Sequence, residues 1–143
     1  MESKLQIISG KHRGRKLILP PDARPTQNRA RIALFNMLES GIIDKNTTIN
    51  VWDVFAGSGA FGIECISRYD ADVVFTDVSP TSVATIRKNI ASIGTENRVK
   101  IIQTDAIAAI SQFAKQSDLV FVDCPYDAAE LGRAFVNHVG RVA

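Results

Sequence analysis

The sequence predicts an α/β fold in which parallel strands alternate with helices, preceded by a basic N-terminal arm. Three observations lead to this prediction. From residue 49 onward, short apolar segments alternate with longer amphipathic ones, which is the pattern of βαβ units. The first apolar segment, residues 49–55, stops on glycines and continues as a helix. Aspartates follow the ends of four successive strands, at the sheet edge where ligands bind in this fold class.

Length and composition predict one globular domain in a reduced, cytoplasmic compartment. The chain has 143 residues, of which 45% are hydrophobic, so it can bury a core. No apolar run approaches the roughly 20 residues that span a bilayer, and the start of the chain lacks the apolar segment of a signal peptide. The two cysteines, Cys65 and Cys124, show no metal-ligand spacing, so we expect no metal.

Positive charge is concentrated at one end of the chain. Residues 1–31 carry eight Lys and Arg against two acidic residues, a net charge of +6, and the remainder carries nine against thirteen, a net charge of −4. A basic front on a mildly acidic body predicts that a polyanion meets the N-terminal part only.

Residues 5–19 have the pattern of a β-hairpin. Two short apolar segments, 5–8 and 16–19, flank a turn that contains glycines. A hairpin of this length is not stable alone, so it must dock on the domain or on a partner. Three prolines then make a stiff connector, and Thr26 is placed to cap a helix that runs to about Ser40.

The cations of this arm predict a surface that grips RNA. They cluster around the hairpin turn and the start of the following helix. Phosphates need cations without fixed geometry, and arginine can also stack on a base. The predicted RNA-binding residues are Lys11, Arg13, Arg15, Lys16, Arg24, Arg29 and Arg31. The alternative is a solvated cationic face that keeps the protein soluble.

The rest of the chain alternates between strand and helix patterns. Strands are predicted over residues 49–55, 73–77, 99–103 and 118–123, and helices from about residue 60 and over 81–93, 106–115 and 128–138. This pattern divides the chain into an N-terminal arm, residues 1–40, and an α/β domain, residues 41–143.

The glycines after the first strand predict a ligand loop. Gly57, Gly59 and Gly62 form a G-x-G-x-x-G pattern, a weak signal whose usual ligand is a dinucleotide. Asp53 at the strand end argues against that ligand, because a carboxylate repels a pyrophosphate and attracts a cation. S-adenosylmethionine carries an α-ammonium and a sulfonium, so we favour it. The alternative is a glycine-terminated strand with a solvated aspartate.

Aspartates after the next two strands predict further contacts with this ligand. Asp77 follows Gly59 near the spacing at which an acidic residue binds ribose hydroxyls. Asp105, with the backbone amide of Ala106, is placed to read the adenine amino edge. Helix capping is the alternative role of both aspartates. The predicted cofactor-binding residues are Asp53, Phe55, Ala56, Gly57, Ser58, Gly59, Asp77, Val78, Asp105 and Ala106.

The segment Asp123-Cys124-Pro125-Tyr126 predicts an acceptor site for an amino group on a planar base. The lone pair of such an amine is delocalised into the ring. Two acceptors, the Asp123 carboxylate and the Cys124 carbonyl, would localise it toward an incoming methyl group, while Tyr126 stacks on the base. All four residues are therefore candidate catalytic residues. The alternative is a turn after a buried strand, with Tyr126 as packing.

Several motifs together resemble the RsmD family of bacterial methyltransferases. They are residues 6–17, 24–26, 31 with 34–36, the stretch Asp-Val-Phe-Ala-Gly-Ser-Gly-Ala-Phe-Gly at 53–62, and the Asp-x-Pro-Tyr at 123–126. The resemblance covers nearly the whole chain. It implies a Rossmann-like class I S-adenosylmethionine-dependent methyltransferase fold. It also implies methylation of the exocyclic N2 of one guanine in 16S ribosomal RNA, with S-adenosylhomocysteine as product, no metal, and the 16S RNA or the small-subunit particle as partner.

The chain departs from the family pattern in three places. Cys124 stands where the family has the first proline of Asp-Pro-Pro-Tyr, which keeps the carbonyl but makes the loop less stiff. Asn28 and Ile32 replace an Asp and a Glu, the expected partners of the arm's arginines. The sequence also stops where the family continues through further strands. We therefore expect strand 118–123 to be an uncovered edge of a monomer, an edge through which dimers can form.

Two other functions stay open from the sequence. An RNA-binding protein that holds the cofactor weakly or not at all agrees with Cys124 and with the short chain. An amino-methyltransferase that acts on adenine N6 or on a protein glutamine agrees with the Asp-x-Pro-Tyr segment. Only the basic arm favours RNA over protein.

Overall fold

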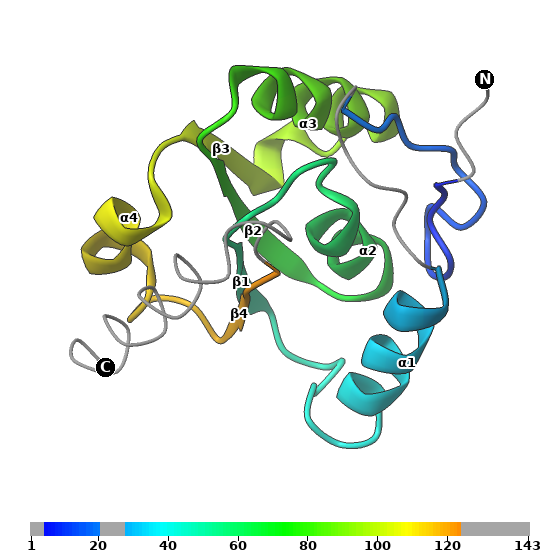
Figure 1. The fold of residues 1–143 in the computed structure, drawn as a ribbon. Helices are drawn as coiled ribbons and strands as arrows, with labels where there is room; N and C mark the ends of the chain where they lie inside the picture. Colours follow the sequence, from blue (N-terminus) through cyan, green and yellow to red (C-terminus); the bar gives the residue numbers. More distant parts are fainter. Residues whose placement is uncertain (1–4, 21–27, 124–143) are drawn as a thin grey trace.

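The computed structural model describes residues 5–20 and 28–123, the side chains of 28–30 excepted. Within this part of the chain, parallel strands form one sheet in the order β3-β2-β1-β4 (Figure 1). The strands are β1 (Ile49–Asp53), β2 (Ala71–Asp77), β3 (Val99–Gln103) and β4 (Leu119–Phe121). The predicted α/β fold with a parallel sheet is confirmed.

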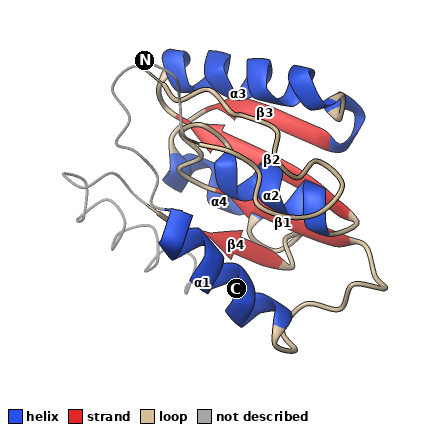
Figure 2. Cartoon of the chain, turned by 90° about the vertical axis from the view of Figure 1, so that its right-hand side faces the viewer, coloured by secondary structure: helices blue, strands red, loops and turns tan. Residues whose placement is uncertain are grey.

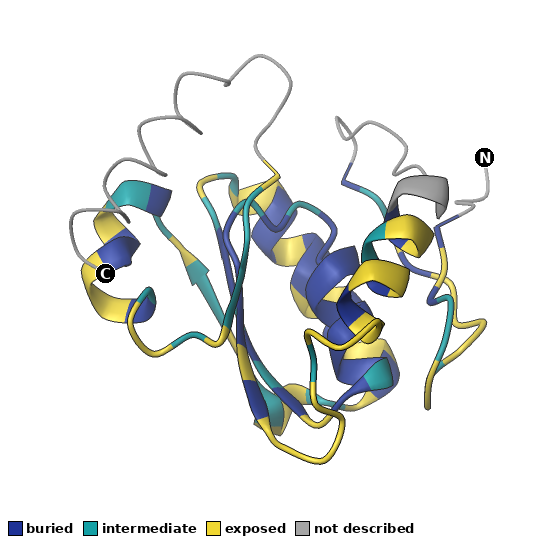
Figure 3. Cartoon of the chain, turned by 90° about the horizontal axis from the view of Figure 1, so that it is seen from below, coloured by how far each residue is buried: buried dark blue, intermediate teal, exposed yellow. Residues whose placement is uncertain are grey.

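Helices cover both faces of this sheet. They are α1 (Asn28–Glu39), α2 (Ala60–Arg68), α3 (Pro80–Ile93) and α4 (Ala106–Phe113), with a short 3-10 helix, η1 (Glu96–Arg98), before β3. Helices α1, α2 and α3 pack on one face, and α4 packs on the other (Figure 1 and Figure 3). Each described crossover from strand to parallel strand therefore carries a helix, as βαβ units require.

The two faces of the sheet bury two hydrophobic clusters. The larger cluster joins the arm, α1, α2 and α3 to the sheet, and within it Phe61 stacks between Phe35 and Phe121 at centroid distances of 5.2 Å and 3.9 Å. The smaller cluster lies under α4, where Trp52 contacts Phe113 at 5.8 Å between ring centroids. Burial on both faces explains why the strands are nearly continuous apolar runs in the sequence.

The arm pairs with itself over a short distance and docks on the domain. Ile7 N–H donates to Arg15 O and Leu17 N–H donates to Leu5 O, both at 2.9 Å, around an isolated antiparallel bridge. Ile7 and Leu17 are each 1% exposed. The predicted docking is confirmed. The two predicted strands are reduced to one bridge, because the outer backbone groups of the arm bond to side chains of α2 and α3 instead.

The predicted elements agree with the observed ones except at their ends. Strand β3 has the predicted bounds, whereas β1 ends at Asp53 because the chain then enters the glycine turn, where Gly59 N–H bonds to Ala56 O at 2.7 Å. Strand β4 and helix α4 are each shorter than predicted. The predicted Thr26 cap and the helix over 128–138 lie outside the described residues.

Candidate functional site

The loop between β1 and α2 needs its glycines for two different reasons. Gly57 and Gly59 have φ angles of 57° and 82°, in the left-handed region that favours glycine. A Cβ on Gly57 would meet no atom within 4 Å, so this side of the loop is open. A Cβ on Gly62, in contrast, would lie 2.4 Å from the ring of Phe75. The first two glycines shape an open loop, and the third lets α2 pack closely on β2.

Asp53 lies beneath this loop. The residue is 1% exposed, and its Oδ2 accepts a hydrogen bond from Gly62 N at 3.1 Å. Burial raises the pKa of Asp53 to about 8; the Gly62 N–H opposes this shift, and the charges of Asp123 and Asp77 add to it. This burial rules out the solvated aspartate that the sequence allowed as an alternative, and a contact of Asp53 with the ligand stays a prediction. Asp53 fastens the first turn of α2 under the loop.

Asp77 ties two loops together at the end of β2. Its Oδ2 accepts from Gly57 N and its Oδ1 accepts from Ser79 N, both at 2.9 Å. The cap of α3 is Ser79 itself, whose hydroxyl accepts from Ser82 N at 3.2 Å. Asp77 therefore positions the glycine loop. Because a carboxylate has about four acceptor sites, it retains capacity for ligand hydroxyls.

Asp105 acts as a helix cap. Its Oδ1 accepts from Ile107 N at 3.4 Å at the start of α4, and Ala106 behind it is 3% exposed. The structure thus shows the alternative role that the sequence allowed for Asp105. The Asp105 carboxylate itself remains exposed to solvent.

The other predicted cofactor residues surround the glycine loop. Val78 is an exposed apolar side chain, with 61% of its surface accessible, directly after Asp77. Phe55 is half-buried, and Ala56 and Ser58 are buried within the turn. An open glycine loop beside an exposed apolar residue and a half-buried carboxylate is a surface that can hold a ligand with apolar and hydroxyl parts.

Three of the strand-end aspartates gather at one point of the sheet edge. Because β1 lies between β2 and β4, the ends of these strands place Asp53, Asp77 and Asp123 together, and both neighbours raise the pKa of Asp53. Asp123 is exposed to solvent. Asp105 follows β3, one strand further from β1.

Some predicted site residues lie outside the part of the chain that the structure describes. They are Arg24, Cys124, Pro125, Tyr126 and the side chain of Arg29. The acceptor segment is therefore placed only by its first residue, Asp123.

The cations of the arm turn face solvent. Lys11, Arg13, Arg15 and Lys16 are all exposed. The guanidinium of Arg15 also donates to Ser92 O near the end of α3. The turn thus presents a compact basic surface, as the sequence predicted.

Arg31 lies inside the protein, which corrects its assignment to the RNA-binding surface. The residue is 5% exposed, its Nη2 donates to Gln6 O at 2.9 Å, and its Nη1 lies 3.5 Å from Glu64 Oε1. Burial lowers the pKa of Arg31, while the charge of Glu64 raises it. Glu64 thus supplies the acidic partner that the sequence left missing at Asn28 and Ile32.

Glu64 is the residue that sequence reasoning missed most clearly. It is fully buried, and its carboxylate accepts from Ile8 N at 2.9 Å, Ser9 N at 3.0 Å and Arg68 Nε at 2.7 Å. The signal was available, because Glu64 is the one acidic residue among the apolar residues of α2. A charge at such a position predicts a buried partner.

Ser67, one turn further along α2, holds the turn of the arm. Its hydroxyl accepts from His12 N at 2.9 Å and donates to Ser9 O at 2.6 Å, and its carbonyl accepts from Lys11 N at 2.9 Å. A Cβ on Gly10 would lie 2.0 Å from Ser67 O. The arm therefore sits against the backbone of α2, as Figure 2 shows from the side.

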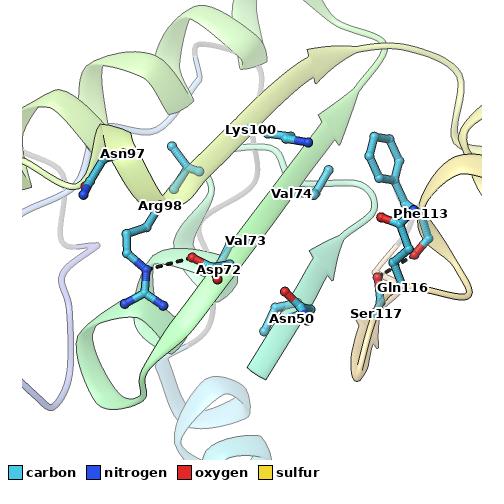
Figure 4. A pocket seen from close by; sticks show the side chains of 12 residues that line it. Asn50, Asp72, Val73, Val74, Asn97, Arg98, Lys100, Phe113, Gln116 and Ser117 are labelled. Carbon is cyan, nitrogen blue, oxygen red and sulfur yellow. Dashed lines mark hydrogen bonds and ion pairs between the residues drawn. The ribbon is translucent and has the colours of Figure 1, made fainter. Parts of the chain in front are cut away.

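A cavity of about 340 Å³ lies at the other end of the sheet (Figure 4). Asn50, Asp72 and Lys100, each near the start of its strand, line it. Arg98 at its rim bonds Asp72 at 2.7 Å. It lies opposite the loop and the aspartates, so it does not coincide with the predicted site.

The described residues form neither a cluster of metal ligands nor a membrane-spanning helix. Residues 5–20 and 28–123 contain no group of three or more His, Cys, Asp or Glu that could hold a metal ion. None of their helices is long and apolar enough to cross a membrane.

Curated relatives match most of this chain. "Ribosomal RNA small subunit methyltransferase D" of Escherichia coli strain K12 is 36% identical over 125 residues, which are 86% of this chain and 61% of the relative. The protein of the same name from Buchnera aphidicola of Acyrthosiphon pisum is 39% identical over 127 residues, 87% of this chain and 64% of the relative. The chain thus spans about three fifths of the length of these relatives.

A solved structure and a family model agree with these matches. The structure named "Putative methyltransferase yhhF from Escherichia coli" has a TM-score of 0.78 at 31% identity, covering 94% of this chain and 71% of that one. Its fold supports the Rossmann-like class predicted from the sequence. The family model described as "Conserved hypothetical protein 95" matches residues 5–141. The chain therefore belongs to this family, the RsmD family that its motifs resemble.

Proposed function

We propose that this chain transfers a methyl group from S-adenosylmethionine to the exocyclic N2 of a guanine in 16S ribosomal RNA. The observation that carries the proposal is the gathering of Asp77, Asp123 and the open glycine loop at one sheet edge, in a chain of the RsmD family. The matched relatives named after small-subunit ribosomal RNA support RNA as the substrate class.

The residues at the loop fit this cofactor. Gly57 is open on the side where a Cβ would otherwise stand, so a ligand can approach the backbone there. Asp77 would accept hydrogen bonds from ribose hydroxyls, and Val78 would contact the adenine ring. Asp105, with the Ala106 amide, would bind the adenine amino edge beyond its capping bond. When bound, the cofactor supplies an electrophilic methyl group on its sulfonium.

The acceptor side would be built around Asp123. Its exposed carboxylate would accept an N–H hydrogen bond from the guanine amino group and so favour a lone pair on nitrogen that points at the methyl group. The Cys124 carbonyl would accept the second N–H, Pro125 would restrict the loop, and Tyr126 would stack on the base. No covalent intermediate is needed, because the acceptor is itself the nucleophile.

The arm would hold the RNA backbone. Its four exposed cations at the turn can bind phosphates, and Arg24 and Arg29 remain proposed contacts. The substrate would be 16S RNA, free or in the small subunit, and we propose that the chain acts as a monomer.

The substitution Asp123→Ala tests this proposal. We expect methylation of 16S RNA, measured by mass spectrometry, to fall by at least two orders of magnitude, while calorimetry shows little change in S-adenosylmethionine affinity. The matched control is Glu96→Ala, an exposed carboxylate on η1 before β3. Retained activity in Asp123→Ala would reject the assignment. No cofactor binding by the unsubstituted chain at millimolar ligand would favour the RNA-binding alternative.

A protein amide is the second candidate acceptor. The "Release factor glutamine methyltransferase" of Clostridium acetobutylicum is 33% identical over 86 residues, 59% of this chain. The exposed cations of the arm favour RNA over that acceptor. Methylation of a release factor, and not of RNA, by the purified chain would reverse this choice.

A further inference from the structure

Asn89 connects two parts of the molecule that the proposed function uses separately. It lies on α3 and is 1% exposed. Its Oδ1 accepts from Ile18 N at 2.8 Å, and its Nδ2 donates to Ile18 O at 3.0 Å and to Ser58 O at 2.9 Å. Ile18 belongs to the arm and Ser58 to the glycine loop. One side-chain amide thus uses both of its N–H groups and its oxygen to join arm and loop.

We propose that Asn89 is a positioning residue that couples RNA binding on the arm to cofactor binding at the glycine loop. This inference rests on the proposed function, because it assumes that the arm meets RNA and that the loop meets the cofactor. RNA binding and cofactor binding then strengthen each other, and the hydrogen bonds of Asn89 are the contact that links them.

The loop depends on Asn89 because Ser58 is buried. Ser58 is 6% exposed and stands between two glycines with positive φ, where the backbone is freest to change. A buried carbonyl without a donor destabilises the conformation that leaves it unpaired. The bond from Asn89 therefore favours the loop conformation in which the Ser58 carbonyl points to α3.

Asn89 depends in turn on the docked arm. Two of its three hydrogen bonds go to the backbone of Ile18, and they hold the amide in one orientation. If the arm lifts, the amide keeps a single bond and is free to rotate away from Ser58. A ligand that stabilises the docked arm therefore stabilises the loop, and by linkage the cofactor stabilises the arm equally.

Among the described residues, the hydrogen bonds by which Glu64 and Ser67 anchor the arm on α2 do not reach the glycine loop. Glu64 and Ser67 bond the arm from the middle and the end of α2, and their contacts reach residues 8–12. Asn89 bonds the arm at Ile18 and the loop at Ser58 directly. Figure 1 shows the arm, in blue, beside α2 and α3.

The first experiment measures the S-adenosylmethionine Kd by calorimetry, with and without saturating 16S RNA transcript. For the unsubstituted chain we expect RNA to tighten cofactor binding by roughly 5- to 150-fold, the usual range of coupling between sites. In Asn89→Ala this ratio should fall to near 1. The control is Thr85→Val, which removes a buried hydroxyl one turn earlier on α3 whose bond goes to Thr81 O at 3.0 Å. It should keep the full ratio.

The second experiment needs no RNA, and its first arm uses the unsubstituted chain alone. Leu17 N–H, bonded to Leu5 O within the arm, reports on arm docking through hydrogen exchange. Saturating S-adenosylmethionine should slow its exchange severalfold in the unsubstituted chain, although Leu17 lies in the arm. In Asn89→Ala, the same addition should leave the exchange rate unchanged.

The outcomes separate this inference from the proposed function. If the chain methylates RNA but RNA does not change cofactor affinity, the coupling is absent and only this inference fails. If a folded Asn89→Ala keeps the full ratio, Asn89 is not the link. If Asn89→Ala does not fold, an unchanged Leu17 exchange rate on adding cofactor to the unsubstituted chain overturns the inference. If the chain binds neither cofactor nor RNA, both proposals fail.

Discussion

The glycine loop and the basic arm are held by contacts of very different sequence separation. In the loop, Asp53 reaches Gly62 across 9 residues and Asp77 reaches Gly57 across 20. In the arm, Glu64 reaches back across 55 and 56 residues and Asn89 across 71. The contacts of the two aspartates thus lie within one βαβ unit, and the longest side-chain contact of the loop, from Asn89 to Ser58, spans 31 residues. The arm is held by residues of α2 and α3 that lie far from it in the sequence.

The two regions also differ in where their polar groups lie. Glu64, Ser67 and Asn89, which anchor the arm, are each at most 1% exposed. Around the loop, Asp77 is half-buried and Asp123 is exposed. The polar groups of the arm therefore act mainly in stability, with its cations left on the outside. Around the loop Asp53 is also buried, but Asp77 and Asp123 remain available to a ligand.

The largest expected effect is on the arm, from Glu64→Ala. This change leaves Arg31 and Arg68 without the carboxylate they share and removes the acceptor of two backbone N–H groups. Removing one partner of a buried ion pair costs about 3–5 kcal/mol of the free energy of unfolding. Urea denaturation followed by the fluorescence of Trp52, the single tryptophan, measures it.

The matched control for that change is Glu39→Ala. Glu39 also bonds Arg68, at 3.4 Å, but its side chain is 27% exposed, so we expect a loss of at most about 1 kcal/mol. Equal losses for Glu64 and Glu39 would contradict the view that burial of the anchors holds the arm.

The next prediction concerns two glycines of the loop, Gly62 and Gly57, whose substitution should have different effects. Gly62→Ala places a methyl group 2.4 Å from the ring of Phe75, and overpacking of this kind costs about 1–3 kcal/mol of stability. Gly57→Ala meets no neighbouring atom but carries the penalty of a positive φ, about 1–2 kcal/mol. We expect Gly57→Ala to weaken S-adenosylmethionine binding as well, as calorimetry would show.

Gly94→Ala is the control for the Gly57 change. Gly94 ends α3 with φ 72° and also has no atom within 4 Å of a built Cβ. It should lose similar stability without any change in cofactor affinity. A cofactor affinity that falls equally in both variants would mean that Gly57 acts through stability alone.

An effect that depends on pH comes from Asp53. Its pKa is about 8 in the folded protein against an ordinary value of 3.8. Between these values the folded state binds the proton more tightly than the unfolded chain does. The free energy of unfolding therefore falls as pH rises through this window, by at most about 1.4 kcal/mol per pH unit from this group.

Asp53→Asn should remove this part of the pH dependence, because the amide oxygen can still accept from Gly62 N and cannot ionise. Urea midpoints at pH 5 and pH 8 measure the slope for both proteins. An unchanged slope in Asp53→Asn would show that the loop is not built on a protonated aspartate.

The smallest expected effect on stability is that of Arg13→Ala. Arg13 is exposed, so the free energy of unfolding should change by no more than about 0.5 kcal/mol. The slope of log binding constant against log salt concentration for RNA should fall in magnitude by about one. Arg31→Gln should have the opposite pattern. It should lower the free energy of unfolding and have no direct effect on the salt dependence of RNA binding. Loss of RNA affinity in a stable Arg31→Gln would restore Arg31 to the RNA surface.

Much of the loop was predictable, because its signals are local. Strand pattern, glycine spacing and the aspartates at strand ends all lie within short windows, and β3 was predicted with its observed bounds. The sequence did not reveal in which direction the Asp53 side chain points. Asp53 turns under the loop to meet Gly62, since α2 begins directly above it.

The sequence predicted that the arm docks, but it did not predict which residues make the contacts. Arg31 was assigned to RNA because a cation in a basic segment is usually exposed. It became an interior residue because α2 brings a buried carboxylate, Glu64, against it. No spacing rule joins residues 31 and 64, and none joins Ile18 to Asn89.

The sequence by itself determined the α/β class, the family, the open glycine loop and the concentration of cations on the arm. These follow from periodicity, from glycines with positive φ and from charge, which act over a few residues. Only the tertiary structure decided which polar groups are buried and paired. Helices α2 and α3 turn Glu64, Ser67 and Asn89 toward the arm, and a buried polar group is stable only with a partner that packing supplies.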